Sequence, residues 1–161
     1  MTWTERLKAT VLLRMFGLFK IPLIFFVGPR VVEMGPERCV LRIPLGWRTR
    51  NHLGGMYFGT LATGADCAGG LAAMQRIRET GANVSLIFKD FHAEFLKRAE
   101  SDVLFTCTEG ANIAAHVDVA AKGTERVTFP VNITATCPDK FGEEPVAKFV
   151  LTLSLKNRAA K

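Results

Sequence analysis

The chain has 161 residues, 48% hydrophobic and 22% charged, so we expect one packed domain over residues 1–161. Its net charge of +6 favours anionic partners, but the basic residues are scattered, and no basic and aromatic run indicates a nucleic-acid surface. The four cysteines and three histidines lack the spacing of metal ligands or redox pairs, so we expect no metal and a cytoplasmic protein with reduced core cysteines.

The first 28 residues predict a helical extension ahead of a core over residues 29–158. Thr2 and Glu5 have capping-box spacing, and Arg14 and Lys20 interrupt the apolar stretch Leu12–Val27, which is too short to span a bilayer. Apolar residues recur at helical spacing: Leu7, Val11, Leu12, Met15 and Phe19. We expect an amphipathic helix that packs on the domain; peripheral contact of its basic face with a membrane is the less favoured alternative.

Two strands, Val31–Gly35 and Glu37–Gly46, are predicted to form a hairpin with a tight turn. A long apolar segment follows the polar loop Trp47–Asn51 and is predicted to be helical from about Gly55 to Thr80. Its many glycine residues would weaken an isolated helix, so close packing must compensate. We therefore expect a buried central helix.

Alternating apolar residues predict four further strands. The first changes frame partway, which indicates a bulge between two sets of residues: Val84, Leu86 and Phe88, then Phe91, Ala93 and Phe95. The other predicted elements are strands around Val103–Cys107, Val127–Ala135 and Phe149–Leu155, and a short helix over Glu109–Lys122. Together the patterns predict an α+β fold, an antiparallel β-sheet wrapped around the long central helix. Disorder is expected only around Asn157–Lys161.

Asp66 is the only ionisable carboxylate in the small and apolar segment Leu53–Met74. A charge there must be paired, protonated or kept for its chemistry, because removing an unpaired charge from water costs on the order of several kcal/mol. The start of the helix offers free N–H groups, but Phe58 lies about 12 Å from Asp66 along the helix axis. The N–H groups at the helix start and Asp66 can therefore act on one reacting group only if two different subunits supply them. We expect a symmetric dimer with composite sites at its interface.

The segment NHLGGMYFGTLATGAD, residues 51–66, resembles the hotdog-fold thioesterases of the phenylacetate-pathway type, whose signature is an Asn, then a His-Gly-Gly group, then an Asp. The opening helix and the sequence WRTRNH resemble more closely one branch of that superfamily, the domain of unknown function 4442. The resemblance implies a hotdog fold and hydrolysis of an acyl thioester. It also implies that Asn51 shapes or polarises the site and that Asp66 is the general base or nucleophile.

Tyr57, Phe58 and Gly59 stand where the family has His-Gly-Gly, and the resemblance implies that the backbone N–H of Phe58 or Gly59 faces the thioester oxygen. The Phe58 side chain would narrow an approach that glycine leaves open. Tyr57 could donate a hydrogen bond in the site or anchor the interface. His52 is a candidate base, although loop histidines usually face solvent.

Further candidates follow from what an acyl-coenzyme A substrate would need. Basic residues would attract its phosphates, and apolar residues would line an acyl tunnel: Arg48, Arg50 and Lys89 for the phosphates, and Met56, Met74, Phe88, Phe91 and Phe95 for the tunnel. Each of them is also explained as a solvated or core side chain. Asp66 has a structural alternative too, a hydrogen bond to Thr60, Thr63 or Asn51 without catalysis.

Three functions follow, in order of preference. The first is an acyl-CoA thioesterase that needs no cofactor, coenzyme A being part of the substrate; the second is a non-catalytic acyl or lipid binder; the third is an enoyl thioester hydratase or dehydratase. The third normally needs a His beside the carboxylate, and none lies on the predicted helix near Asp66. The expected partners are the acyl thioester and a second copy of the chain, with a tetramer left open and nucleic acid excluded.

Overall fold

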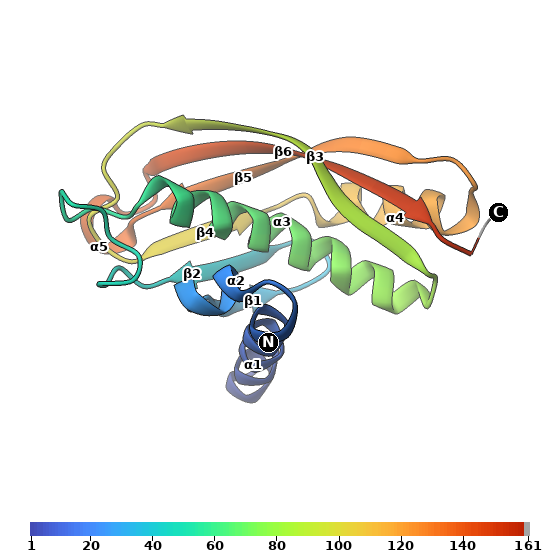
Figure 1. Ribbon diagram of the computed structural model, residues 1–161, viewed down its shortest axis with the longest axis horizontal. Coiled ribbons are helices and arrows are strands. Elements are labelled where there is room, and N and C mark those ends of the chain that lie inside the picture. Colours follow the sequence, from blue (N-terminus) through green and yellow to red (C-terminus); the bar gives the residue numbers. More distant parts are fainter. Residues whose placement is uncertain (160–161) are drawn as a thin grey trace.

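The computed structural model describes residues 1–159, in which a six-stranded antiparallel sheet curves around one long helix (Figure 1). The strands lie in the order β1 (Arg30–Met34), β2 (Cys39–Ile43), β4 (Val103–Cys107), β5 (Val127–Thr136), β6 (Pro145–Asn157) and β3 (Val84–Phe95). Helix α3 (Phe58–Thr80) packs against β2 to β6, and α4 (Gly110–Lys122) packs beside it. The predicted α+β class is confirmed.

The core forms where the sheet faces α3. In β5 and β6 alternate side chains are buried: Phe129, Val131, Ile133 and Ala135, and Phe149, Leu151, Leu153 and Leu155. Burying each large apolar side chain stabilises the fold by roughly 1.5–3 kcal/mol. The alternation of apolar residues predicted from the sequence therefore matches the alternation of buried side chains on the inner face of the sheet. The cysteines are buried as predicted, namely Cys39, Cys67, Cys107 and Cys137.

Strand β3 forms one edge of the sheet and pairs with β6. The pairing register shifts between Phe88 and Asp90, which confirms the predicted bulge. No strand of residues 1–159 lies on the other side of β3. Its backbone N–H and C=O groups on that side are therefore open to a further strand.

Helix α3 begins at Phe58, later than the predicted start near Gly55. Met56 N–H donates to the Ala99 carbonyl at 2.7 Å, and Tyr57 N–H donates to the Thr49 carbonyl at 2.8 Å. Because neighbouring loops hold both amides, the backbone turns into a helix only after Tyr57, which is the N-cap.

The N-terminal segment forms two helices, α1 (Trp3–Lys20) and α2 (Pro22–Val27), and α1 projects from the body (Figure 1). The predicted capping box between Thr2 and Glu5 is present. The predicted single helix breaks at Ile21, because Pro22 disfavours helical backbone at the residue before it. No helix in the described part of the chain is long and apolar enough to cross a membrane.

The packing face predicted for α1 is wrong. The side chains expected to pack are exposed: Leu7, Val11, Leu12, Met15 and Phe19. The buried face instead carries Ala9, Leu13 and Gly17, and α1 packs against α2 and β1. Small residues decide this orientation, because they let two helices approach closely. A Cβ at Gly17 would lie 2.6 Å from the backbone nitrogen of Phe25.

The end of the chain also differs from its prediction. Asn157 is the last residue of β6, and its side-chain amide donates to the Ala121 carbonyl at 2.7 Å, so the disorder predicted from Asn157 is wrong at that residue. Residues 160 and 161, also included in that prediction, lie outside the described residues. A short helix, α5 (Pro138–Phe141), connects β5 to β6.

Substitution of Gly64 tests how closely α3 packs against the sheet. A Cβ at Gly64 would overlap the ring of Phe105, whereas a Cβ at Gly69 would make an ordinary contact, 3.6 Å from Ile133 Cδ1. Both changes to Ala add the same helix propensity. We therefore expect Gly64→Ala to lower the free energy of unfolding by about 1–3 kcal/mol and Gly69→Ala to raise it by up to about 1 kcal/mol. Urea unfolding measures both, and equal stability of the two variants would contradict this packing.

Candidate functional site

A tight turn holds the start of α3 in place. Asn51 N–H donates to the Gly55 carbonyl at 2.7 Å, and the Asn51 side-chain oxygen accepts the Leu53 N–H at 2.9 Å. Tyr57 N–H is bound to the Thr49 carbonyl. Since the residues before the helix are fixed by these bonds, the first N–H groups of α3 keep a defined direction.

Phe58 and Gly59 are the first two residues of α3, and their N–H groups donate no hydrogen bond within residues 1–159. Helical geometry leaves the first N–H groups without intrahelical partners, and the helix dipole adds partial positive charge there. Main-chain donors of this kind suit an oxygen that gains negative charge. They belong to the main chain, so every residue except proline at position 58 keeps them.

Asp66 lies about two turns further along α3, in the wall of a pocket with a volume of about 390 Å³. We call this the Asp66 pocket. It is enclosed by α3, β1, the first half of β3 and the two N-terminal helices, and its lining residues other than Asp66 and Arg78 are uncharged. Burial raises the pKa of Asp66 from 3.8 to about 6, because desolvation penalises the ionised carboxylate. Such a group is ionised at neutral pH and is a stronger base than an ordinary Asp.

The carboxylate of Asp66 accepts no hydrogen bond from any residue that the structure describes, the three expected donors Thr60, Thr63 and Asn51 included. The Thr63 hydroxyl instead donates to the Gly59 carbonyl at 2.8 Å, and the Asn51 side-chain oxygen is engaged by Leu53. The structural role considered for Asp66 thus lacks its hydrogen bonds. Both carboxylate oxygens remain available to a ligand in the pocket.

Four partly exposed aromatic rings gather at the start of α3 and along β3: Tyr57, Phe58, Phe91 and Phe95. The ring centroids of Tyr57 and Phe58 are 4.8 Å apart, and those of Phe58 and Phe95 are 6.4 Å apart. Phe91 and Phe95 both lie against the buried ring of Phe149. The Phe58 side chain is nevertheless 59% exposed. An exposed apolar group of this size beside an open strand edge indicates a contact surface.

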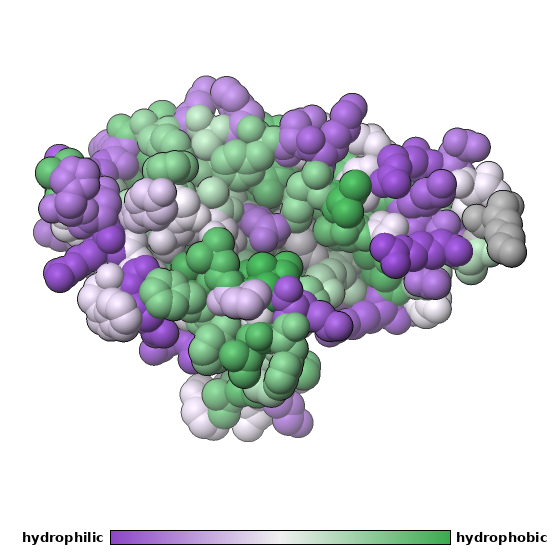
Figure 2. Space-filling view, viewed as in Figure 1, coloured by the Kyte–Doolittle hydropathy of each residue, from purple (hydrophilic) through white to green (hydrophobic). Residues whose placement is uncertain are grey.

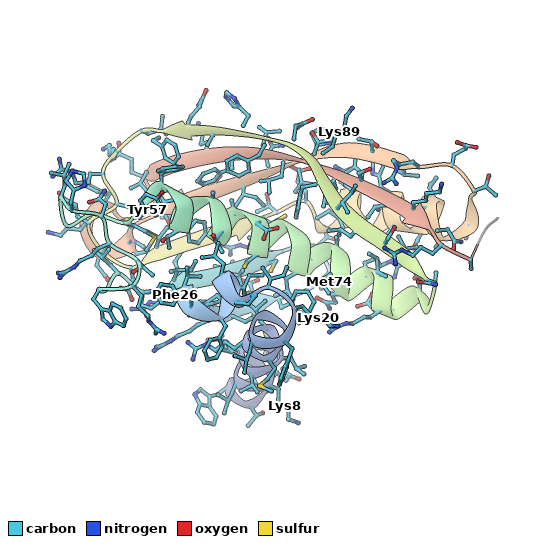
Figure 3. All side chains as sticks on the ribbon, viewed as in Figure 1. Lys8, Lys20, Phe26, Tyr57, Met74 and Lys89 are labelled. Carbon is cyan, nitrogen blue, oxygen red and sulfur yellow. The ribbon has the colours of Figure 1, made fainter. Side chains whose placement is uncertain are left out.

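The apolar candidates fall into separate places. Phe88 and Met74 line the Asp66 pocket, whereas Met56 is buried in the core. Figure 3 shows Tyr57 at the start of α3 and Met74 toward its other end. Phe91 belongs to the aromatic group near the helix start and does not line the pocket.

The basic candidates lie outside the pocket. Arg48 is exposed, and its guanidinium lies 5.8 Å from the ring centroid of Phe26 and 5.9 Å from that of Trp47. Further candidates are exposed and also absent from the pocket wall, namely Arg50, Lys89 and His52. In Figure 3 the side chain of Lys89 points away from α3.

Sequence reasoning missed the wall of the pocket formed by α1, α2 and the residue between them, which includes Leu12, Phe16, Ile21 and Ile24. A helix that is apolar on two sides has no unique packing face, so periodicity does not place these residues. The one usable signal is Pro22, which predicts the helix break that brings α2 against α3.

Solved structures of other proteins share this fold. A protein of unknown function from Pseudomonas aeruginosa, described as a "Probable Thioesterase", is 23% identical, with a TM-score of 0.75 over 92% of this chain and 96% of its own. A thioesterase from Haemophilus influenzae is 18% identical, with a TM-score of 0.66 over 89% of this chain and 88% of its own. A mutant thioesterase from Pseudomonas aeruginosa is 17% identical, with a TM-score of 0.67 over 92% and 94%. Together with the sheet around α3, these likenesses show the predicted hotdog fold.

Residues 9–154 match the family described as a domain of unknown function, DUF4442, and the chain belongs to that family. The match confirms the branch that the opening helix and the WRTRNH sequence indicated. No curated protein matches the sequence.

The raised pKa of Asp66 predicts a pH-dependent cost to stability. The folded protein holds the Asp66 proton more tightly than the unfolded chain, so stability from this group is present at low pH and is lost as the pH rises from about 4 to about 6. Asn cannot ionise. We expect Asp66→Asn to match wild type near pH 4 and to exceed its free energy of unfolding by up to about 3 kcal/mol above pH 7.

Chemical unfolding across this pH range measures the difference. Asp139→Asn removes an exposed carboxylate in α5 and is the matched control, expected to change little at any pH. The same pH dependence in Asp66→Asn and wild type would contradict a desolvated, ionisable Asp66.

Proposed function

We propose that the protein hydrolyses acyl thioesters such as acyl-coenzyme A, at two composite sites in a symmetric homodimer. The observation that carries the proposal is Asp66, a carboxylate without a hydrogen-bond partner in the described chain, in the wall of an apolar pocket of about 390 Å³. An apolar pocket with one reactive polar group suits a hydrocarbon tail next to a bond to be cleaved. The family resemblance and the thioesterase names of the structural neighbours support the same chemistry.

In the proposed reaction, Asp66 removes a proton from a water molecule, and the water oxygen bonds to the thioester carbon. The carbonyl oxygen becomes an oxyanion that accepts hydrogen bonds from the Phe58 and Gly59 N–H groups of the other subunit. The tetrahedral intermediate then breaks its carbon–sulfur bond, and the proton held by Asp66 passes to the leaving thiolate. The products are a carboxylic acid and a thiol, and no cofactor is consumed.

Two subunits are required because Asp66 and the start of its own helix are about 12 Å apart along the axis. A second copy could join the sheet through the open edge of β3, which runs for 12 residues. The aromatic group at the start of α3 lies beside that strand and would be buried by the same contact. The partner's helix start would thus be brought toward Asp66.

The acyl tail would occupy the Asp66 pocket, where Phe88 and Met74 contribute apolar surface. The coenzyme A phosphates would remain outside. The exposed Arg48 and Arg50 lie close in sequence to the turn before α3 and could attract those phosphates. Asn51 has its side-chain oxygen engaged, so its amide NH₂ group is the part that could polarise a substrate.

Activity should depend on Asp66 and on its ionisation. We expect Asp66→Asn to lower hydrolysis of a panel of acyl-coenzyme A substrates by about 10²–10⁴-fold while the dimer stays intact. In wild type, kcat/KM should rise as the pH increases through about 6, because the ionised carboxylate is the base. Thiol release measures both effects. Undiminished hydrolysis by Asp66→Asn would remove Asp66 from the mechanism.

A composite site predicts complementation between two inactive variants. Phe58→Pro removes one N–H donor at a helix position that tolerates proline, and Asp66→Asn removes the base. A heterodimer of the two variants contains one complete site, so it should have about half of the wild-type activity, far above that of either variant homodimer. Two affinity tags allow the heterodimer to be purified and assayed.

Phe58→Leu is the control for the proline variant, because it shortens the side chain and keeps the amide. It should retain hydrolysis. Inactive heterodimers would place Asp66 and its oxyanion donors in one subunit, and an inactive Phe58→Leu would assign the effect to the ring in place of the amide.

A non-catalytic acyl binder is the second candidate, favoured by one observation. The Phe58 ring is exposed, and by the family resemblance it stands at a glycine of the signature, where it would narrow the approach to the amides. Mass spectrometry of extracted ligand, together with no turnover on any panel member, would favour this function. The hydratase alternative has less support, since none of the three histidines lines the pocket in the described structure.

A further inference from the structure

The outer face of the two N-terminal helices is an apolar surface that nothing in residues 1–159 covers (Figure 2). Helices α1 and α2, together with the adjoining Trp47, are called here the N-terminal protrusion. Its exposed side chains include Trp3, Leu7, Val11, Met15, Phe19 and Phe26. Apolar residues are thus concentrated on the part of the chain that stands away from the sheet (Figure 1).

Helix α1 is apolar on two opposite sides. One side packs through Leu13 and Gly17 on α2 and β1. The other carries Leu7, Val11 and Met15 at intervals of four residues, and these form a continuous stripe that faces outward. An apolar stripe on the exposed side of a surface helix is unusual, and together with the charged residues that flank it the stripe indicates a contact surface.

The aromatic composition of the protrusion fits the boundary of a lipid bilayer. Both tryptophans of the chain are here, with Trp3 74% and Trp47 76% exposed, and Phe19 is 72% exposed. Phe26 packs edge-on against Trp47 with ring centroids 6.1 Å apart. Tryptophan is enriched where lipid headgroups meet acyl chains, because its ring is apolar and its N–H still finds a polar partner.

The charge of the protrusion is complementary to anionic lipid. Helices α1 and α2 contain four basic side chains and one acidic side chain, Glu5, which is held in the capping box. One of the four, Arg14, donates to the backbone carbonyls of Gly28 and Pro29, which leaves Arg6, Lys8 and Lys20. Lys8 and Lys20 are exposed on α1 (Figure 3), and Arg48 lies against the rings of Phe26 and Trp47. Positive side chains around an apolar and aromatic helix face are the features of helices that lie in a membrane surface.

We propose that the N-terminal protrusion docks the protein onto the surface of an anionic lipid bilayer. The apolar stripe and the tryptophans enter the interface between headgroups and acyl chains, and the lysine and arginine side chains contact lipid phosphates. The protein lies on the membrane without crossing it. A second copy of the chain is a poorer occupant, because a two-fold contact between protrusions would bring two clusters of the same positive charge together.

Docking through the protrusion would place the Asp66 pocket next to the membrane surface. Leu12 and Ile21 are exposed on the protrusion and also line the Asp66 pocket. The pocket therefore opens beside the docking surface. An acyl chain that leaves the bilayer at this surface has a short apolar route to the pocket.

Vesicle sedimentation with the full chain tests the proposal. We expect wild type to pellet with phosphatidylcholine vesicles that contain about one third phosphatidylglycerol, to bind pure phosphatidylcholine much more weakly, and to be released by raising the salt from about 0.1 to 1 M. Val11→Glu with Phe19→Glu should weaken binding by about tenfold or more. Val119→Glu is the matched control, because Val119 is an equally exposed apolar residue on α4 and its substitution should leave binding unchanged.

Charge reversal separates the electrostatic part. Lys8→Glu with Lys20→Glu should abolish the preference for anionic vesicles, whereas Lys122→Glu with Lys140→Glu, on α4 and α5, adds the same negative charge elsewhere and should retain it. Circular dichroism checks that each variant is folded. Wild type that stays in the supernatant with anionic vesicles would overturn the proposal. So would protrusion variants that bind like wild type, or a Val11→Glu and Phe19→Glu variant whose only change is dissociation of a wild-type oligomer.

Discussion

The seating of α3 on the sheet is the contact on which the rest of the structure depends. The buried face of the helix is built of small residues, and Gly64 lies directly against the ring of Phe105. Because no large side chain separates them, the helix backbone approaches the strands closely and the sheet curves around it. This packing fixes two things at once. It sets the direction of the helix start, where the Phe58 and Gly59 amides are unpaired within residues 1–159, and it sets the side of α3 on which Asp66 emerges.

The ionised carboxylate of Asp66 lowers the stability that this packing provides. Arg78 lines the same pocket, but it lies about 18 Å further along the helix axis, so it does not neutralise the carboxylate. Desolvation is accordingly the cause of the raised pKa. A desolvated carboxylate with no partner is poorly explained by folding alone, because Asn or Ala would fit α3 at lower cost. A functional site is where a protein keeps such a group, and the ionised form that destabilises the fold is the same form that could act as a base.

Elements that bury one face show a regular spacing of apolar residues, and these elements could be predicted from the sequence. The strands of the sheet, the bulge in β3 and the central helix follow from alternation or from small-residue composition, and the structure confirms them. Predictions failed where the local structure depends on contacts with residues distant in the sequence. The start of α3 moved to Phe58 because Ala99 and Thr49 hold the preceding amides. The packing face of α1 was wrong because both of its faces are apolar, and only the close approach to α2 at Gly17 selects one. The same ambiguity concealed the part of the Asp66 pocket that α1 and α2 supply.

The two edges of the sheet are suited to different partners. At the β1 edge, the Thr10 hydroxyl of α1 accepts the Val31 N–H at 2.9 Å, and the helix packs against this strand. At the β3 edge, backbone groups remain open over Val84–Phe95 within the described sheet. Backbone pairing is directional and fixes a register, which suits a second copy of the chain. An apolar and basic helix face has no such directionality, which suits a fluid surface. The Asp66 pocket is lined by both α1 and β3. A partner bound at either edge of the sheet would therefore lie next to this pocket.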